Sequence, residues 1–188
     1  MTGCADGPLG SDPWTSPPVL GFPVAAPAAV ESLAAYGTPN WSGTEPHNGV
    51  DLVLNTAAAS VMIKAPCKGT VTKIEVKSNS YSNPPGQMLL TVEITVNLNW
   101  VVSLNLEPGT VDDALKKMQE DAIKVSVGQK LYEGDDIGLL FRGEQGHTHL
   151  HYMIYHKGGT VCAYSVSSDE AKSIFDSISA YSGTNPCY

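Results

Sequence analysis

The sequence predicts a mainly β protein: an antiparallel β-sheet core with a short insertion helix, a C-terminal helix and a Pro-rich N-terminal arm. Three observations predict this architecture. Residues 50–106 form short runs rich in β-branched and aliphatic residues, each bounded by Gly, Pro, Asn or Ser. Two later segments repeat apolar residues at helical spacing. Most of the 13 prolines lie before residue 47. We therefore expect an arm over residues 1–45 and one domain over residues 46–188.

The strands are expected where apolar runs meet turn residues. This pattern predicts strands at residues 50–55, 60–65, 69–77, 88–98, 100–106 and 137–141. Residues 78–86 contain Asn79, Asn83 and two consecutive prolines, so we expect a loop there. This loop either rims a substrate groove or is a solvated connection.

The helices are expected in three places. In the arm, residues 25–36 predict a short helix after a proline. Residues 109–125 predict an insertion helix of about 13 residues, with Thr110 as the candidate N-cap. The last helix is expected over residues 169–181, capped by Ser167 or Ser168.

Three aromatic side chains of the arm, Trp14, Phe22 and Trp41, indicate that it packs on the rest of the chain. They either anchor the arm to the core or cover the mouth of a site.

Composition and charge restrict the class of protein. The chain has 188 residues, 42% of them hydrophobic, which is enough for one domain with a real core. Its formal charge of −8 argues against nucleic acid and anionic membrane surfaces as direct partners. The sequence holds no apolar run of membrane-spanning length and no recognisable signal peptide, so we expect the numbering to start on a mature or trimmed chain. A monomer is expected.

The four cysteines leave several pairings open. Thr2-Gly3-Cys4 is similar to the end of a bacterial lipoprotein processing site, in which the cysteine is acylated, although a chance tripeptide is the alternative. Cys162 and Cys187 flank the C-terminal segment, so a disulfide between them is expected in an oxidising compartment. Buried free thiols are the alternative, and four cysteines allow three connectivities.

Three of the five histidines, His147, His149 and His151, occupy alternate positions in one stretch. Residues two apart on a strand point to the same face, so a strand beginning by His147 would present all three together. Histidine is the commonest nitrogen ligand for zinc, and such a face suits a metal site. The alternative is a surface strand with histidines in its polar register. His156 falls on the opposite face and is expected to be unrelated to the metal.

A second motif lies about 100 residues upstream, at His47-Asn48-Gly49-Val50-Asp51. Asn48-Gly49 favours a turn, which would bring the His47 and Asp51 side chains close enough for one ion. One carboxylate, one or two histidines and water form a catalytic type of zinc site with an open fourth position. No Cys-x-x-Cys pair indicates a structural zinc site.

His-x-Gly-x-Asp followed by His-Leu-His-aromatic resembles the lysostaphin/LytM-type zinc endopeptidases, which cut peptide cross-bridges of bacterial cell walls. Residues 63–71 and 127–138 resemble two further pieces of the family pattern, in the right order. The resemblance implies a LytM-like antiparallel sheet, a Zn²⁺ cofactor, a peptidoglycan peptide substrate and an extracytoplasmic location. Carried over by position, it implies His47, Asp51 and His151 as zinc ligands and His149 as a catalytic residue.

The sequence departs from the family pattern at the second catalytic histidine. No histidine occurs between Asp51 and His147, and Asn105 is the best alignment to the missing residue, with Glu107 next. The resemblance therefore implies a weak peptidase, or one in which His147 or Glu107 compensates. A second hypothesis is an inert zinc-binding domain that recognises cell-wall peptide or regulates another hydrolase. A cupin-like metal barrel has little support, because the expected glutamate is missing after His149.

Overall fold

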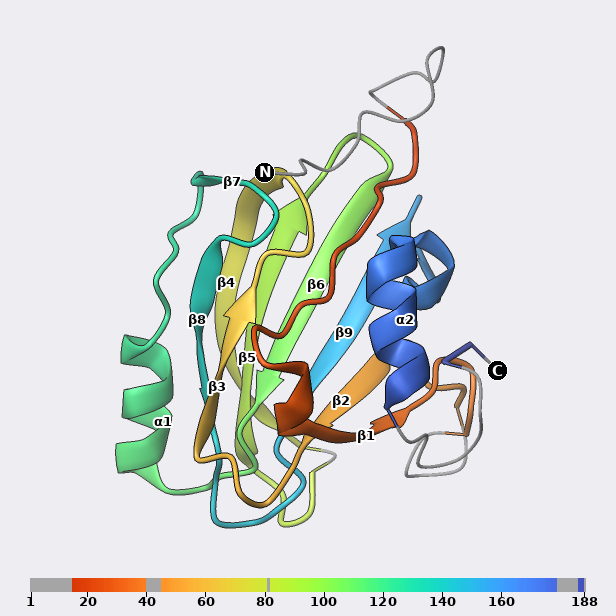
Figure 1. Cartoon of the computed structure of the whole chain (residues 1–188). Coiled ribbons are helices and arrows are strands. Elements are labelled where there is room, and N and C mark those ends of the chain that lie inside the picture. The colour runs from red at the N-terminus through yellow and green to blue at the C-terminus, as the bar shows by residue number, and fades with distance from the viewer. Residues whose placement is uncertain (1–14, 40–44, 81, 179–185, 188) are drawn as a thin grey trace.

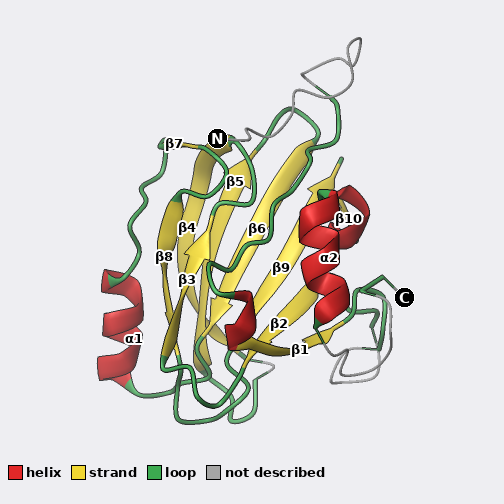
Figure 2. Cartoon of the chain, viewed as in Figure 1, coloured by secondary structure: helices red, strands yellow, loops and turns green. Residues whose placement is uncertain are grey.

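The computed structural model describes residues 15–39, 45–80, 82–178 and 186–187, which form a strongly twisted antiparallel sheet with a smaller sheet and helices beside it (Figures 1 and 2). The strands of the described residues are β1 (Val30–Ala34), β2 (Val50–Leu54), β3 (Ser60–Lys64), β4 (Gly69–Asn79), β5 (Gln87–Thr95), β6 (Trp100–Glu107), β7 (Lys130–Leu131), β8 (Asp136–Phe141), β9 (His149–His156) and β10 (Gly159–Val161). The helices are η1 (Pro27–Ala29), α1 (Asp113–Asp121), η2 (Ala163–Val166) and α2 (Asp169–Ser177).

The large sheet has the order β1-β2-β9-β6-β5-β4-β7, with β10 paired to β9. The smaller sheet pairs β3 with β8. All these pairings are antiparallel. Because β9 comes late in the chain but lies between β2 and β6, the topology brings three distant sequence segments side by side. The mainly β fold with an insertion helix and a C-terminal helix is confirmed.

The two faces of the large sheet differ because side chains alternate along each strand. The even-numbered residues of the central strands β2, β5, β6 and β9 are buried and, apart from one tyrosine, apolar, with the exception of His156 at the end of β9. Together with Val61, Ile63, Ile137 and Leu140 of β3 and β8 they form one core cluster. Figure 1 shows β3, β8 and α2 lying over this face. The odd-numbered side chains therefore lie on the other face, which carries the polar residues.

Of the predicted elements, the helix over residues 25–36 is wrong. The structure has a single 3₁₀ turn, η1, followed by strand β1, which pairs with β2 at the sheet edge. Pairing of Val30 and Leu33 with β2 buries both side chains, and this tertiary contact outweighs a local helix preference. The described part of the arm thus packs on the sheet. Phe22 contacts Phe175 of α2, with ring centroids 5.1 Å apart, whereas Trp14 and Trp41 lie outside the described residues.

Both predicted later helices exist, but each is shorter than expected. Helix α1 begins after Asp112, whose side chain accepts a hydrogen bond from the Leu115 N–H, so Thr110 is not its N-cap. Helix α2 begins after Ser168, whose side chain accepts from the Ala171 N–H as predicted. It ends at Ser177, before the predicted end.

The expected disulfide joins Cys162 to Cys187, and the Cys67 side chain is buried in the core. Cys4, the candidate lipidation site, lies outside the described residues. Among the residues that the structure describes, no helix is long and apolar enough to cross a membrane.

Candidate metal and catalytic site

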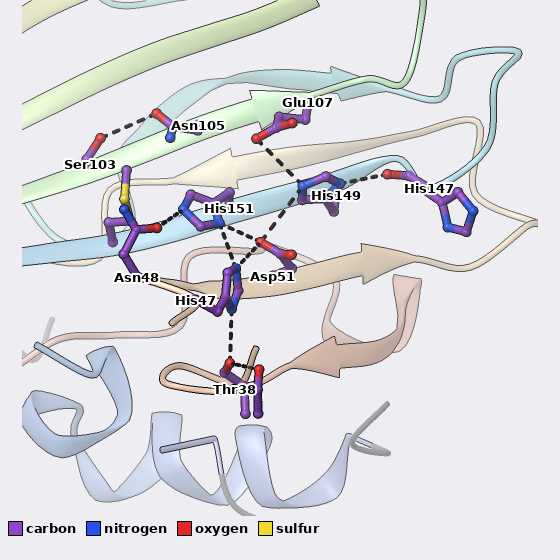
Figure 3. Close-up of polar contacts among 12 residues, drawn as sticks. Thr38, His47, Asn48, Asp51, Ser103, Asn105, Glu107, His147, His149 and His151 are labelled. Carbon is purple, nitrogen blue, oxygen red and sulfur yellow. Dashed lines mark hydrogen bonds and ion pairs between the residues drawn. The ribbon is translucent and has the colours of Figure 1, made fainter. Parts of the chain in front are cut away.

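The candidate site lies on the polar face of the sheet, where β2, β9 and β6 are neighbours (Figure 3). Asp51 pairs with His151, and His151 pairs in turn with Asn105. One step along, His149 lies directly opposite Glu107. Cross-strand partners on one face have Cβ atoms about 4.5–5.5 Å apart, so the register alone brings these side chains together.

His47 reaches the site through the predicted turn before β2. Its backbone N–H donates to the carbonyl of Thr38, and its own carbonyl accepts from the Gly37 N–H, which ties the turn to the end of β1. Gly49 allows this close approach, because a Cβ there would lie 2.8 Å from Cε1 of His151. The turn that the sequence predicted thus carries His47 to Asp51.

His47, Asp51 and His151 present three ligand atoms to one point. Nε2 of His47 lies 3.2 Å from Oδ1 of Asp51 and 3.2 Å from Nδ1 of His151, and these last two atoms are 2.6 Å apart. Ligands about 2.0–2.1 Å from a tetrahedral zinc ion are separated by about 3.3 Å. Two sides of the triangle therefore match those of such a site, and the third, at 2.6 Å between Asp51 and His151, is clearly shorter.

The outer nitrogens of both histidines face oxygen acceptors. Nδ1 of His47 lies 2.9 Å from the Ala35 carbonyl oxygen, and Nε2 of His151 lies 3.1 Å from Oδ1 of Asn48. A carbonyl oxygen can only accept, so each outer nitrogen carries the proton and donates it. In the neutral rings the two inner nitrogens then expose lone pairs toward a carboxylate. Three acceptors at 2.6–3.2 Å need a cation between them, either an added proton or a metal ion.

The pKa values of Asp51 and His47 reflect this arrangement. Burial acts to raise the pKa of the Asp51 carboxyl, yet the charge of His149 and the hydrogen bonds of His151 and His47 hold this pKa well below its usual value. For His47, burial acts to lower the pKa, but the hydrogen bond and charge of Asp51 raise it overall. The three side chains are only 7–12% exposed. The site thus favours positive charge next to Asp51.

His149 lies beside the triangle and is not part of it. Its Nδ1 lies 2.6 Å from the His147 carbonyl oxygen, so Nδ1 carries a proton and Nε2 is the atom that faces the site. Nε2 lies between two carboxylates, 3.8 Å from Oδ1 of Asp51 and 3.6 Å from Oε1 of Glu107. Burial opposes the charged ring, but the charges of Asp51 and Glu107 raise the pKa of His149 to about 10.

Asn105, the residue aligned with the missing histidine, is buried directly opposite His151. Its Oδ1 accepts hydrogen bonds from the hydroxyls of Thr91 at 2.8 Å and Ser103 at 3.4 Å. These two bonds fix the amide, and Figure 3 shows its nitrogen on the side of His151. Asn105 therefore offers N–H donors to the site.

The prediction that three histidines share one strand face is wrong for His147. Strand β9 begins at His149, and His147 has a positive φ of 53° in the preceding turn. His156 stacks on Trp100, with ring centroids 4.2 Å apart, and is not part of the group formed by His47, Asp51 and His151. Sequence reasoning missed Asn48 as a partner of His151 and Asn79 as a partner of Glu107. The position of Asn48 inside the first motif was a signal for the former, whereas Asn79 had none.

No protein-family model matches the chain, and no curated protein matches it. Solved structures do. The Helicobacter pylori protein Csd3 in an orthorhombic crystal has a TM-score of 0.52 at 21% identity, over 80% of this chain and 35% of Csd3. For Csd3 in a hexagonal crystal the TM-score is 0.50 at 18% identity, over 84% of this chain and 37% of Csd3. A mutant catalytic domain of the prophage-encoded M23 protein EnpA from Enterococcus faecalis has a TM-score of 0.46 at 19% identity, over 69% of this chain and 85% of the EnpA domain.

The chain spans about a third of the length of Csd3. The likeness to Csd3 concerns the fold, which is the LytM/M23-type fold that the sequence motifs predicted.

Proposed function

We propose that this protein is a zinc-dependent metalloendopeptidase that hydrolyses peptide bonds of bacterial cell-wall peptidoglycan. The observation that carries the proposal is the convergence of two histidine nitrogens and one carboxylate oxygen, with the remaining N–H of each histidine donated outward. Two nitrogens and one oxygen at this spacing suit a zinc ion with an open fourth position. The LytM/M23-type fold and the two histidine motifs support the substrate class.

A zinc ion in such a site lowers the pKa of its water toward neutrality and polarises a carbonyl oxygen. The side chains beside the ligands would supply the remaining chemistry. His149 holds an exchangeable proton on Nε2, which it can give to a leaving amine or share with a developing oxyanion. Asn105 can donate a hydrogen bond to that oxyanion but cannot exchange a proton at physiological pH. We assign His149 and Asn105 these catalytic roles on this basis.

The environment that we propose is extracytoplasmic, because the Cys162–Cys187 disulfide persists in oxidising compartments. A lipid anchor at Cys4 would hold the protein at a membrane, and we propose that it acts as a monomer on peptidoglycan peptide.

A second candidate function is that of a catalytically inert, zinc-binding domain that recognises cell-wall peptide or regulates another hydrolase. The presence of Asn105, where the family pattern has a histidine, favours it. The two functions share the metal site and differ only in turnover.

The first experiment is to measure zinc per chain in protein purified without added metal. About one zinc per chain is expected, lost in His151→Ala and kept in His156→Ala, which removes a histidine of the same strand outside the site. Hydrolysis of purified peptidoglycan by the zinc-loaded protein, lost with chelator and restored by zinc, would establish the enzyme. Binding of zinc without any hydrolysis would favour the inert domain, and no binding in excess zinc would refute both.

A further inference from the structure

We propose that Glu107 is a positioning residue for His149, restraining its ring beside the metal-binding triangle. This inference rests on the proposed function. Its starting point is the strand register. Glu107 is the last residue of β6, and it lies directly opposite His149, the first residue of β9, on the same face of the sheet.

The Glu107 carboxylate is held at both oxygens. Oε2 accepts a hydrogen bond from Nδ2 of Asn79 at 3.2 Å, at the end of β4, and Oε1 lies 3.6 Å from Nε2 of His149. Only 18% of the side chain is exposed. A carboxylate that is anchored from behind and lies near the N–H of an imidazole restrains the direction of that N–H through its charge. Here it faces the nitrogen that carries the transferable proton, whereas the carboxylate of a Ser-His-Asp triad holds the opposite nitrogen.

The other carboxylate near His149 is occupied. Oδ1 of Asp51 is 3.8 Å from Nε2 of His149, but the same oxygen is 2.6 Å from Nδ1 of His151 and 3.2 Å from Nε2 of His47. It therefore belongs to the metal-binding triangle. Glu107 is the carboxylate that remains for His149 when Asp51 binds a cation.

Both nitrogens of the His149 ring thus face an oxygen atom. Nδ1 donates to the His147 carbonyl, and Nε2 faces Glu107. Asn105 cannot share this task, because it lies opposite His151 and its Oδ1 is engaged by Thr91 and Ser103. Asn105 would supply a hydrogen-bond donor to the substrate, and Glu107 would orient His149.

The test is imidazole ¹⁵N NMR of the zinc-loaded protein at one pH, which needs no substrate. Glu107→Gln is expected to shift the His149 Nε2 resonance and leave those of His47 and His151 in place. Asn79→Ala, which frees Oε2 without altering Glu107, is expected to cause a smaller shift of the same resonance. Glu75→Gln is the matched control, because Glu75 lies on β4 and pairs with Lys73 and Lys77. An unchanged His149 resonance in Glu107→Gln would overturn the proposal.

Kinetics add a second readout. Glu107→Gln is expected to lower kcat about 10–100-fold, less than loss of a whole acid–base group, with KM and zinc content unchanged. In a His149→Ala background the same substitution is expected to cost nothing, because both residues act as one unit. An equal loss in that background would show that Glu107 acts without His149 and would refute the positioning role. Absence of hydrolysis by the unaltered protein would contradict the proposed function, while the NMR result still decides the contact.

Discussion

Asn48→Ala is expected to weaken metal binding although Asn48 offers no atom to the metal triangle. Oδ1 of Asn48 accepts a hydrogen bond from Nε2–H of His151 at 3.1 Å. This bond keeps the proton on Nε2 and leaves the lone pair on Nδ1, the atom that faces the triangle. Without this acceptor the proton can move to Nδ1 and the ring can rotate. Loss of such a partner typically lowers metal affinity 10–100-fold, or about 1.4–2.7 kcal/mol of binding free energy. The Kd for zinc should rise by that factor at unchanged stoichiometry.

The assay is a competition titration with a chromophoric chelator at neutral pH. Asn97→Ala is the matched control, because the Asn97 side chain also forms hydrogen bonds in a turn, to Ser16 and Asn99. This turn connects β5 to β6 and does not contribute to the site. Asn97→Ala should bind zinc like the unaltered protein, and His47→Ala should bind far more weakly than either. A Kd in Asn48→Ala equal to that of the control would refute the assigned protonation of His151.

Three further predictions concern the same structure. Gly49→Ala should weaken zinc binding about 10-fold or more in the same titration, because the added carbon would lie 2.8 Å from the His151 ring and displace it. Replacing Cys162 and Cys187 by serine should lower the free energy of unfolding by about 3 kcal/mol in urea melts, since the bridge closes a loop with a sequence separation of 25. Glu144→Gln should lower Tm near neutral pH but not near pH 2. Hydrogen bonds from a threonine hydroxyl and a backbone N–H lower the pKa of Glu144 from 4.5 to about 2. The stabilisation that the ionised carboxylate contributes is therefore present above pH 4.5 and is lost as the pH falls toward 2.

The strands could be predicted because their pattern is local. Runs such as residues 50–54 and 100–107 contain buried apolar residues at alternate positions, bounded by turn residues, and they appear within a residue or two of their predicted bounds. Residues 25–36 were misassigned because no local feature of Val30 or Leu33 indicates that β2 is available as a partner. A long-range contact decides that segment.

Only part of the metal triangle follows from local patterns in the sequence. The turn at Asn48-Gly49 predicts that His47 lies near Asp51, whereas the place of His151 was implied by the family resemblance and depends on the pairing of β2 with β9. The pairing of His149 with Glu107 needs the antiparallel register of β6 and β9, which the sequence does not state. His147 was misplaced because the alternation of histidines continues one residue pair beyond the strand itself.

That register matters for both faces of the sheet at once. Three even residues of β9, Leu150, Tyr152 and Ile154, are fully buried, and the odd residues His149 and His151 face the candidate site. A slip of one residue would bury the histidines and expose the core residues. Thr148 opposes such a slip: its buried hydroxyl donates to the Pro108 carbonyl and accepts from the Gly143 N–H, and its carbonyl accepts from the Leu54 N–H. A single buried threonine therefore ties the start of β9 to the ends of β2 and β6, and the packing that fixes the core also fixes the spacing of the ligands.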